Sequence, residues 1–345
     1  MKKNEYVEIA GQGSNVCHFS DRAASVEAAQ LSADARTAIP HDVQQLIVID
    51  YKAMQNSAAA TNLRERLMPA ELKPFDEALR KSGLNENHDV EQLAFALFRT
   101  KDSGDTLTTV GIAQGQFPIQ EITASFRKRG FKATMVRSNR IYPMPKTGMV
   151  VSFIDASTMI FGTPDAVRKS LDARDGQAES MLTNPTMMEA MKSVDTEPLW
   201  SVLDDKGTQF MVHQLLGNAG SVTDFDSVRK HLQSCRYGMD FQHGVHLNLS
   251  IETGDNFIAA TLSSIFNAAI SLRKMSAPEV EKQALAATSI YSNLGNLEIQ
   301  FATSNDEFAS LLNILLSPVD IGVSVYREID RDLVAIDSNE QNKRI

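Results

Sequence analysis

The side chains best suited to metal chemistry are two histidines, His243 and His246. A zinc site needs three or four converging ligands, often with a carboxylate that orients them. No further Cys or His lies close to this pair, and the pair falls on a predicted turn and on the outer face of a predicted strand. We therefore predict no metal-binding residues and no cofactor.

Two groups of carboxylates stand where acid–base chemistry could occur. Asp204 and Asp205 follow an apolar segment around Trp200, and Asp50 ends an apolar segment nearer the amino terminus. Carboxylates at a strand end could transfer protons in a hydrolase. Asp is also a common N-terminal cap of helices. Because Asp50 and Asp204 hold equivalent places, we favour capping and predict no catalytic residues.

Motifs for phosphate binding and nucleophilic catalysis are missing from the sequence. The glycines of segment 111–115 (GIAQG) lack the GxGxxG and GxxxxGK[ST] spacings, and no GxSxG, HExxH or SxxK pattern occurs. Met187, Met188 and Met191 could line a permissive binding groove, although such residues more often fill a core. The sequence predicts no cofactor-binding residue and favours a protein that is not an enzyme.

Short apolar strands and amphipathic helices must position these residues. In the first part of the chain, the pattern predicts strands at 44–50, 92–100, 106–115, 132–142 and 149–162. It predicts helices at 51–68, 70–82 and 118–129, and another that begins with Thr163-Pro164-Asp165.

The second part repeats this order of elements. Strands are predicted at 199–203, 235–241, 245–252 and 297–303, and helices at 206–216, 224–232, 255–273 and after the capping box Ser304–Glu307. Segment 114–126 resembles 252–265, and segment 159–171 resembles 299–312. We therefore predict two similar halves related by a pseudo-two-fold duplication.

The alternation of side chains sets the register of one predicted hairpin. Val245 begins a strand in which apolar and polar residues alternate, and Phe241 ends the matching set on the preceding strand. A three-residue loop, Gln242-His243-Gly244, keeps both apolar sets on one face, with Gly244 at positive φ. The same register turns Cys235 inward.

The predicted fold class is α+β, with an antiparallel sheet and helices on one sheet face in each half. The predicted divisions are a flexible leader at 1–30, the first half at 31–175, the second half at 176–316 and a C-terminal extension at 317–345. The extension carries a short helix with Val325, Ile329, Leu333 and Ile336 on one face. The halves could share one continuous sheet or form two.

Composition excludes several classes of partner. The formal net charge is −9, and the densest basic group, within 127–132, ends a predicted helix, so nucleic acid is a poor partner. No apolar run approaches the roughly 18–20 residues of a membrane helix. The amino terminus lacks the apolar stretch of a signal peptide. Two cysteines, Cys17 and Cys235, do not make a disulfide framework, although one bridge between them is left open.

The segment SADARTAIPHDVQQLIVIDYKAMQNS, with VGIAQGQF and LDARDG further on, resembles a family of uncharacterised bacterial proteins that usually carry an export signal. The resemblance covers roughly 32–312, includes no functional motif and implies a periplasmic or secreted α+β protein. This chain departs from the pattern at both ends.

Three functional hypotheses follow. We favour a non-catalytic binding or interaction protein, with a small ligand or a protein as partner. The first alternative is an assembly or scaffold protein that uses an exposed sheet edge or the helix at 325–336. The second is a hydrolase with a site near Asp50 or Asp204 that no motif marks.

Overall fold

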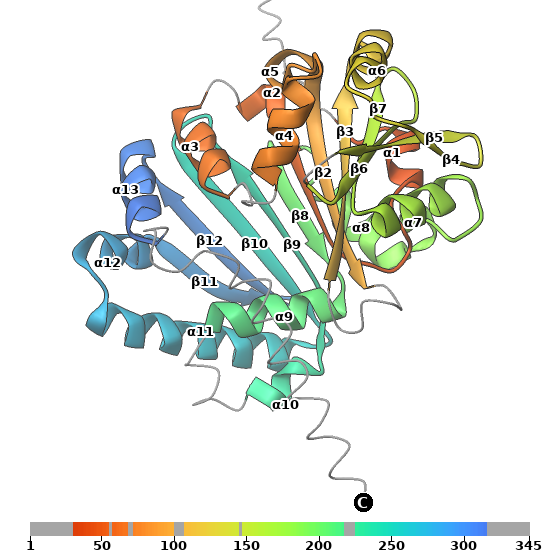
Figure 1. Cartoon of the computed structure of the whole chain (residues 1–345). Helices are drawn as coiled ribbons and strands as arrows, with labels where there is room; N and C mark the ends of the chain where they lie inside the picture. The colour runs from red at the N-terminus through yellow and green to blue at the C-terminus, as the bar shows by residue number, and fades with distance from the viewer. Residues whose placement is uncertain are drawn as a thin grey trace, which may run out of the picture.

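The computed structural model describes residues 30–54, 57–67, 72–99, 107–144, 147–216 and 225–315. Its central element is one continuous antiparallel sheet of twelve strands, in the order β11-β12-β10-β9-β8-β1-β2-β3-β7-β6-β5-β4. Figure 1 shows this sheet crossing the molecule, with helices packed against it. The predicted α+β class is confirmed, and the two halves share a single sheet.

The first half supplies seven strands and most of the short helices. Its strands are β1 (Val43–Asp50), β2 (Val90–Arg99), β3 (Leu107–Gly115), β4 (Thr134–Val136), β5 (Asn139–Met144), β6 (Met149–Phe153) and β7 (Thr158–Gly162). Its helices are α1 (Ala33–Thr37), α2 (Tyr51–Met54), α3 (Ala58–Leu67), α4 (Leu72–Arg80), α5 (Glu86–Asp89), α6 (Ile119–Lys128) and α7 (Pro164–Arg174).

The second half supplies the other five strands. These are β8 (Leu199–Leu203), β9 (Leu232–Asp240), β10 (Val245–Thr253), β11 (Thr288–Asn293) and β12 (Asn296–Thr303). The helices of this half are a 3₁₀ turn (Met181–Thr183), α8 (Pro185–Lys192), α9 (Asp205–Leu216), α10 (Phe225–Arg229), α11 (Asn256–Ser276), α12 (Glu279–Ala286) and α13 (Asn305–Leu315).

The halves meet at the central strand pair β1–β8. From this pair the order runs β1-β2-β3-β7-β6 in one direction and β8-β9-β10-β12-β11 in the other. In each half the first three strands in the chain are neighbours in the sheet, and a helix follows the third strand. A later hairpin, β6–β7 or β11–β12, then pairs with the free edge of that third strand. The two segment pairs that resemble each other in sequence occupy matching places in this order.

Two rows of side chains that cross the sheet define its faces. The Trp200 face carries one residue from each of nine paired strands: Ile160, Ile112, Ala94, Val48, Trp200, Gly238, Asn248, Gln300 and Ser289. The Tyr237 face carries their neighbours: Phe161, Gly111, Phe95, Ile47, Ser201, Tyr237, Leu249, Ile299 and Ile290. Side chains of paired residues share a face because strands alternate with period two.

Helices cover the two faces unequally. On the Trp200 face, α1 and α7 pack over the first half and α8 packs on β8 and β9 of the second half. On the Tyr237 face of the first half, α4 and α6 pack. Over the second half, α3, α9, α10, α11 and α13 all contribute to clusters on the Tyr237 face. The prediction of helices on one face is therefore wrong for the first half and for β8 and β9, where α8 adds cover on the Trp200 face. The inner strands of the first half are apolar on both faces, so both need cover.

Element boundaries differ from the predictions in several places, and the short helices α1 and α5 were not predicted. The predicted helix 51–68 is two helices, α2 and α3. The Ser57 hydroxyl caps α3 by accepting a hydrogen bond from the Ala60 N–H at 3.2 Å. Helix α10 is shorter than the predicted 224–232. Strand β11 and helix α12 were not predicted, because the strand sequence TSIYSN is largely polar and carries a weak apolar signal.

The hairpin between β9 and β10 has the predicted register. Asp240 pairs with His246, which leaves a three-residue loop inside the flanking Phe241 and Val245. Gly244 has a φ of 106°, and a Cβ there would lie 2.6 Å from the Thr303 carbonyl oxygen. Cys235 is buried, and that burial raises the pKa of its thiol.

Several predictions lie outside the described residues. They concern nearly all of the leader at 1–30, with Cys17, and the extension at 317–345 with its helix. Within the described ranges, no helix is long and apolar enough to cross a membrane.

Candidate functional site

Two of the carboxylates considered for catalysis, Asp50 and Asp204, are helix caps, and the third, Asp205, is the first residue of α9. The Ala53 N–H donates to Asp50 Oδ1 at 2.8 Å, and the Gly207 N–H donates to Asp204 Oδ1 at 2.7 Å. Burial raises the pKa of Asp204 to about 6. The two residues lie at opposite ends of the β1–β8 pair, because Asp50 bonds to Pro198 and Asp204 bonds to Gln44 through the main chain. The structure thus confirms capping and does not bring these carboxylates together.

Neither the histidine pair nor the methionine cluster forms a binding site. His243 is exposed in the hairpin loop, while His246 is exposed on the Trp200 face opposite Asp240. No group of three or more His, Cys, Asp or Glu residues in the described part of the chain could hold a metal ion. Met187 and Met191, on α8, are buried in the core, which contradicts a methionine-lined groove.

The Trp200 face changes character along its length. From β7 to β8 its row is apolar and buried, whereas from β10 to β11 the residues Asn248, Gln300 and Ser289 are exposed. We call the second part the polar sheet surface. It is formed by Arg236, Asp240, His246, Asn248, Glu252, Ser289, Tyr291, Glu298 and Gln300 on strands β9, β10, β11 and β12. Alternation places these residues opposite the buried set that faces α9 and α11.

Hydrogen bonds between neighbouring strands order the polar sheet surface. The Ser234 hydroxyl donates to Glu252 Oε2 at 2.9 Å, and the Ser250 hydroxyl donates to Glu298 Oε1 at 2.9 Å. At the edge strand, Gln300 Nε2 donates to the Tyr291 hydroxyl at 3.0 Å. Paired polar side chains across strands fix one another, so the surface presents a defined pattern of donors and acceptors.

Glu197 marks the border between the covered and the open part of the face. Its side chain lies across Gly238, where a Cβ would come within 2.6 Å of Glu197 Cγ. Burial raises the pKa of the Glu197 carboxyl, and the negative charge of Asp240 raises it further. Sequence reasoning missed this residue, because it precedes β8 in the chain and meets β9 only through sheet pairing.

The charge of this region is predominantly negative. Four carboxyl groups, those of Glu197, Asp240, Glu252 and Glu298, accompany the single guanidinium group of Arg236 on the surface or at its border. An ordered array of carboxylates, amides and hydroxyls binds cations and hydrogen-bond donors. The arrangement is suited to binding a molecule that carries cations and hydrogen-bond donors.

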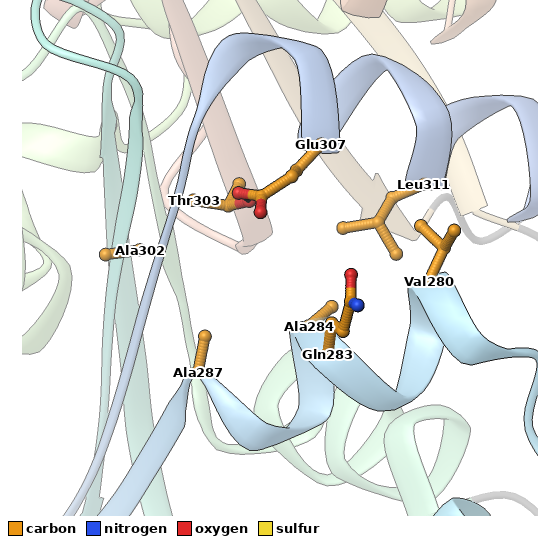
Figure 2. Close-up of a pocket in the computed structure, with 8 residues that line it drawn as sticks. All are labelled: Val280, Gln283, Ala284, Ala287, Ala302, Thr303, Glu307 and Leu311. Carbon is orange, nitrogen blue, oxygen red and sulfur yellow. Dashed lines mark hydrogen bonds between the residues drawn. The ribbon is translucent and has the colours of Figure 1, made fainter.

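A small cavity lies between α12, the end of β12 and α13 (Figure 2). Its volume is about 60 Å³. It is lined by Val280, Gln283, Ala284, Ala287, Ala302, Thr303, Glu307 and Leu311. Thr303 pairs with Val245, so the cavity lies on the Tyr237 side of the end of β12, whereas Ala302, the sheet partner of His246, faces the polar sheet surface.

Comparisons with known proteins give a limited result. No protein-family model matches the chain, and no curated protein matches it. Similar solved structures include crystal form I of TP0453, with 13% identity, a TM-score of 0.48, and coverage of 82% of this chain and 98% of that chain. Crystal form III has 14% identity, a TM-score of 0.47, and coverage of 82% and 99%. At these values the likeness assigns no function to this chain.

Proposed function

We propose that this protein is a non-catalytic interaction protein that binds a protein partner on its polar sheet surface. The observation that carries the proposal is the change along one row of the Trp200 face. Ile112, Val48 and Trp200 are buried under helices, whereas Asn248 and Gln300 on the same row are exposed. An open, internally hydrogen-bonded sheet face offers a broad and rigid platform for a partner.

The chemistry of the surface favours a basic partner. Its carboxylates outnumber its cations, and the whole chain carries a formal net charge of −9. Opposite charges on the two surfaces would accelerate encounter and exclude acidic competitors. The resemblance to usually exported bacterial proteins supports a partner outside the cytoplasm, in the periplasm or the surrounding medium.

The experiment is chemical cross-linking of the whole protein in fractions of its own host, with mass-spectrometric quantification of each linked partner. The test variant carries Asn248→Arg and Gln300→Arg, which place two bulky cations on the polar sheet surface. The matched control carries Gln116→Arg and Gln120→Arg on exposed positions of the first half. We expect a partner that is retained by the wild type and the control and reduced about tenfold in the test variant. Equal recovery by all three proteins would refute the proposal.

Assembly through the edge strand β11 is a second candidate. This strand pairs only with β12 among the described strands, its register is unbroken, and its sequence TSIYSN carries no charge and no proline. Natural edge strands usually carry a charge, a bulge or a proline that blocks further pairing. Native mass spectrometry should then show oligomers that Ser292→Lys disperses. A wild-type monomer at high concentration would exclude this candidate.

We also propose that the two halves arose by internal duplication. The strand order is the same outward from β1 and from β8, and the segment pairs 114–126 with 252–265 and 159–171 with 299–312 fall at matching places. If this is correct, homologous sequences aligned half against half should keep these two pairings in register. Registers that shift from one homologue to the next would remove the support.

A further inference from the structure

We propose that the cavity between α12, β12 and α13 binds a primary alkylammonium group, presented as a lysine side chain of the protein partner. The assignment of the source to a partner lysine rests on the proposed function. The cation site itself stands on the geometry of the cavity.

The walls of the cavity suit a short alkyl chain. Val280 and Ala284 line it from α12, and Leu311 lines it from α13 (Figure 2). A volume of about 60 Å³ accommodates about four or five groups the size of a water molecule. This matches the end of a lysine side chain, whose methylenes pack on apolar surface while the ammonium group keeps polar partners.

A carboxylate with accepting capacity supplies the counter-charge. Glu307 Oε2 accepts from the Ser304 N–H at 3.1 Å, from the Ser304 hydroxyl at 2.9 Å and from the Thr303 hydroxyl at 2.9 Å. These bonds hold the pKa of Glu307 below its ordinary value, so the group stays ionised at neutral pH. All three end on Oε2, and the other carboxylate oxygen is available to an ammonium donor.

Gln283 supplies a second polar group. Its side chain extends from α12 into the space between the two helices, facing Leu311 (Figure 2). An amide oxygen can accept a hydrogen bond from an ammonium group, which has three donors. A neutral alcohol of the same size would fill the same space but would gain only weaker, uncharged hydrogen bonds.

The cavity and the polar sheet surface share strand β12 but lie on opposite sides of it. Thr303 and Ala302 end β12, and their sheet partners are Val245 and His246. The cavity lies on the Tyr237 side of these strands, so a partner on Asn248 and Gln300 reaches it by extending past the end of β12. A basic partner provides lysine side chains at this point.

The test uses the whole protein with its methyl groups labelled for nuclear magnetic resonance. The probe is n-butylammonium chloride, and 1-butanol is its neutral isostere. We expect n-butylammonium to shift the methyl signals of Val280 and Leu311 with a saturable, millimolar dissociation constant, and 1-butanol to bind about tenfold more weakly. Equal binding of the two probes would overturn the proposal.

Matched variants localise the effect. Glu307→Gln removes the charge but keeps a residue that completes the capping box, so the helix start is preserved. Glu279→Gln is the control, because Glu279 is exposed on α12 and does not line the cavity. We expect Glu307→Gln to weaken n-butylammonium binding about tenfold and Glu279→Gln to leave it unchanged. Ala284→Leu fills the cavity and should abolish binding without loss of helix content.

A blocked lysine, N-acetyl-lysine N-methylamide, identifies the source. If it binds as n-butylammonium does, the partner lysine is supported. If n-butylammonium binds and the blocked lysine does not, the lysine assignment is wrong and the site takes small amines. If neither probe binds, the cation site is refuted, while cross-linking on the polar sheet surface decides the proposed function independently.

Discussion

Helices α7 and α13 follow matching strands in the two halves, yet they pack on opposite faces of the sheet. Phe161 is the next-to-last residue of β7 and Phe301 lies near the end of β12, and both face the Tyr237 side. The cap Thr163 comes two residues after Phe161, whereas the cap Ser304 comes three residues after Phe301. Since successive strand residues face opposite ways, the one extra residue directs α13 to the other face.

The difference leaves the Trp200 face open over β10, β12 and β11. Helix α7 contacts β3, β6 and β7 and buries the Trp200 face there. Helix α13 instead contacts α3 and α12 and joins the cluster around Leu199 and Val245 on the Tyr237 face. The polar sheet surface and the neighbouring cavity both follow from this placement. A single residue between strand and cap thus decides whether a sheet face becomes core or surface.

The strongest test removes that residue. Deleting Thr303 gives the second half the spacing of the first and moves Phe308 out of its packing against α3. We expect a loss of about 3–5 kcal/mol in the free energy of unfolding, comparable to truncating a buried Phe. Urea denaturation measures the loss, and hydrogen exchange should show faster exchange in α3.

Thr303→Ala is the control for the deletion, because it keeps the spacing and removes only the hydroxyl bond to Glu307. If the deletion costs no more than this substitution, the spacing does not determine the side on which α13 packs.

Two glycines sharpen the contrast between apolar and polar cover. A Cβ at Gly111 would lie 2.2 Å from the Phe161 ring, which is buried, and a Cβ at Gly238 would lie 2.6 Å from the half-buried Glu197 side chain. We expect Gly111→Val to cost about 2–3 kcal/mol by displacing a packed ring. Gly238→Val should cost less than about 1 kcal/mol, because Glu197 can swing into solvent. Equal losses in urea denaturation would contradict this contrast.

The cap of α9 should make stability depend on pH. The pKa of Asp204 is raised to about 6 in the folded state, above the unfolded value near 4, so the folded state binds this proton more tightly. The resulting stabilisation is present below pH 4 and is lost as the pH rises to about 6. Between pH 4 and pH 7, the free energy of unfolding of the Asp204→Asn variant should therefore rise by about 2 kcal/mol relative to that of the wild type. Asn also caps helices.

The measurement for Asp204 is urea denaturation of both proteins at a series of pH values. Asp50→Asn, the matching cap in the first half, controls for the loss of a cap carboxylate. If the free energies of unfolding of the wild type and of Asp204→Asn differ by the same amount at every pH from 4 to 7, the proposed titration is excluded.

The smallest effect is expected at the centre of the polar sheet surface. Asn248→Ala should change the free energy of unfolding by less than about 0.5 kcal/mol, because the side chain is exposed. The same variant should still reduce cross-linking to the partner. A large loss of stability would show that Asn248 has a structural role instead.

Much of the fold could be predicted from local patterns. The apolar run before Asp50 predicted β1, the alternation after Gly244 predicted the register of β10, and Thr163 and Ser304 marked two helix starts. Strand β11 escaped prediction because its polar sequence is stabilised mainly by pairing with β12. The site was harder to predict, since its residues come from four strands and no motif links them.

The sequence by itself determined the elements, the antiparallel hairpins and the caps, because these depend on neighbours within a few residues. The tertiary structure alone decided that both halves join in one sheet, that Glu197 lies across Gly238 and that Asn248 is exposed while Trp200 is buried on the same row. These properties depend on which strands pair and on which face each helix packs. Both are set by contacts between residues far apart in the chain, which local periodicity does not record.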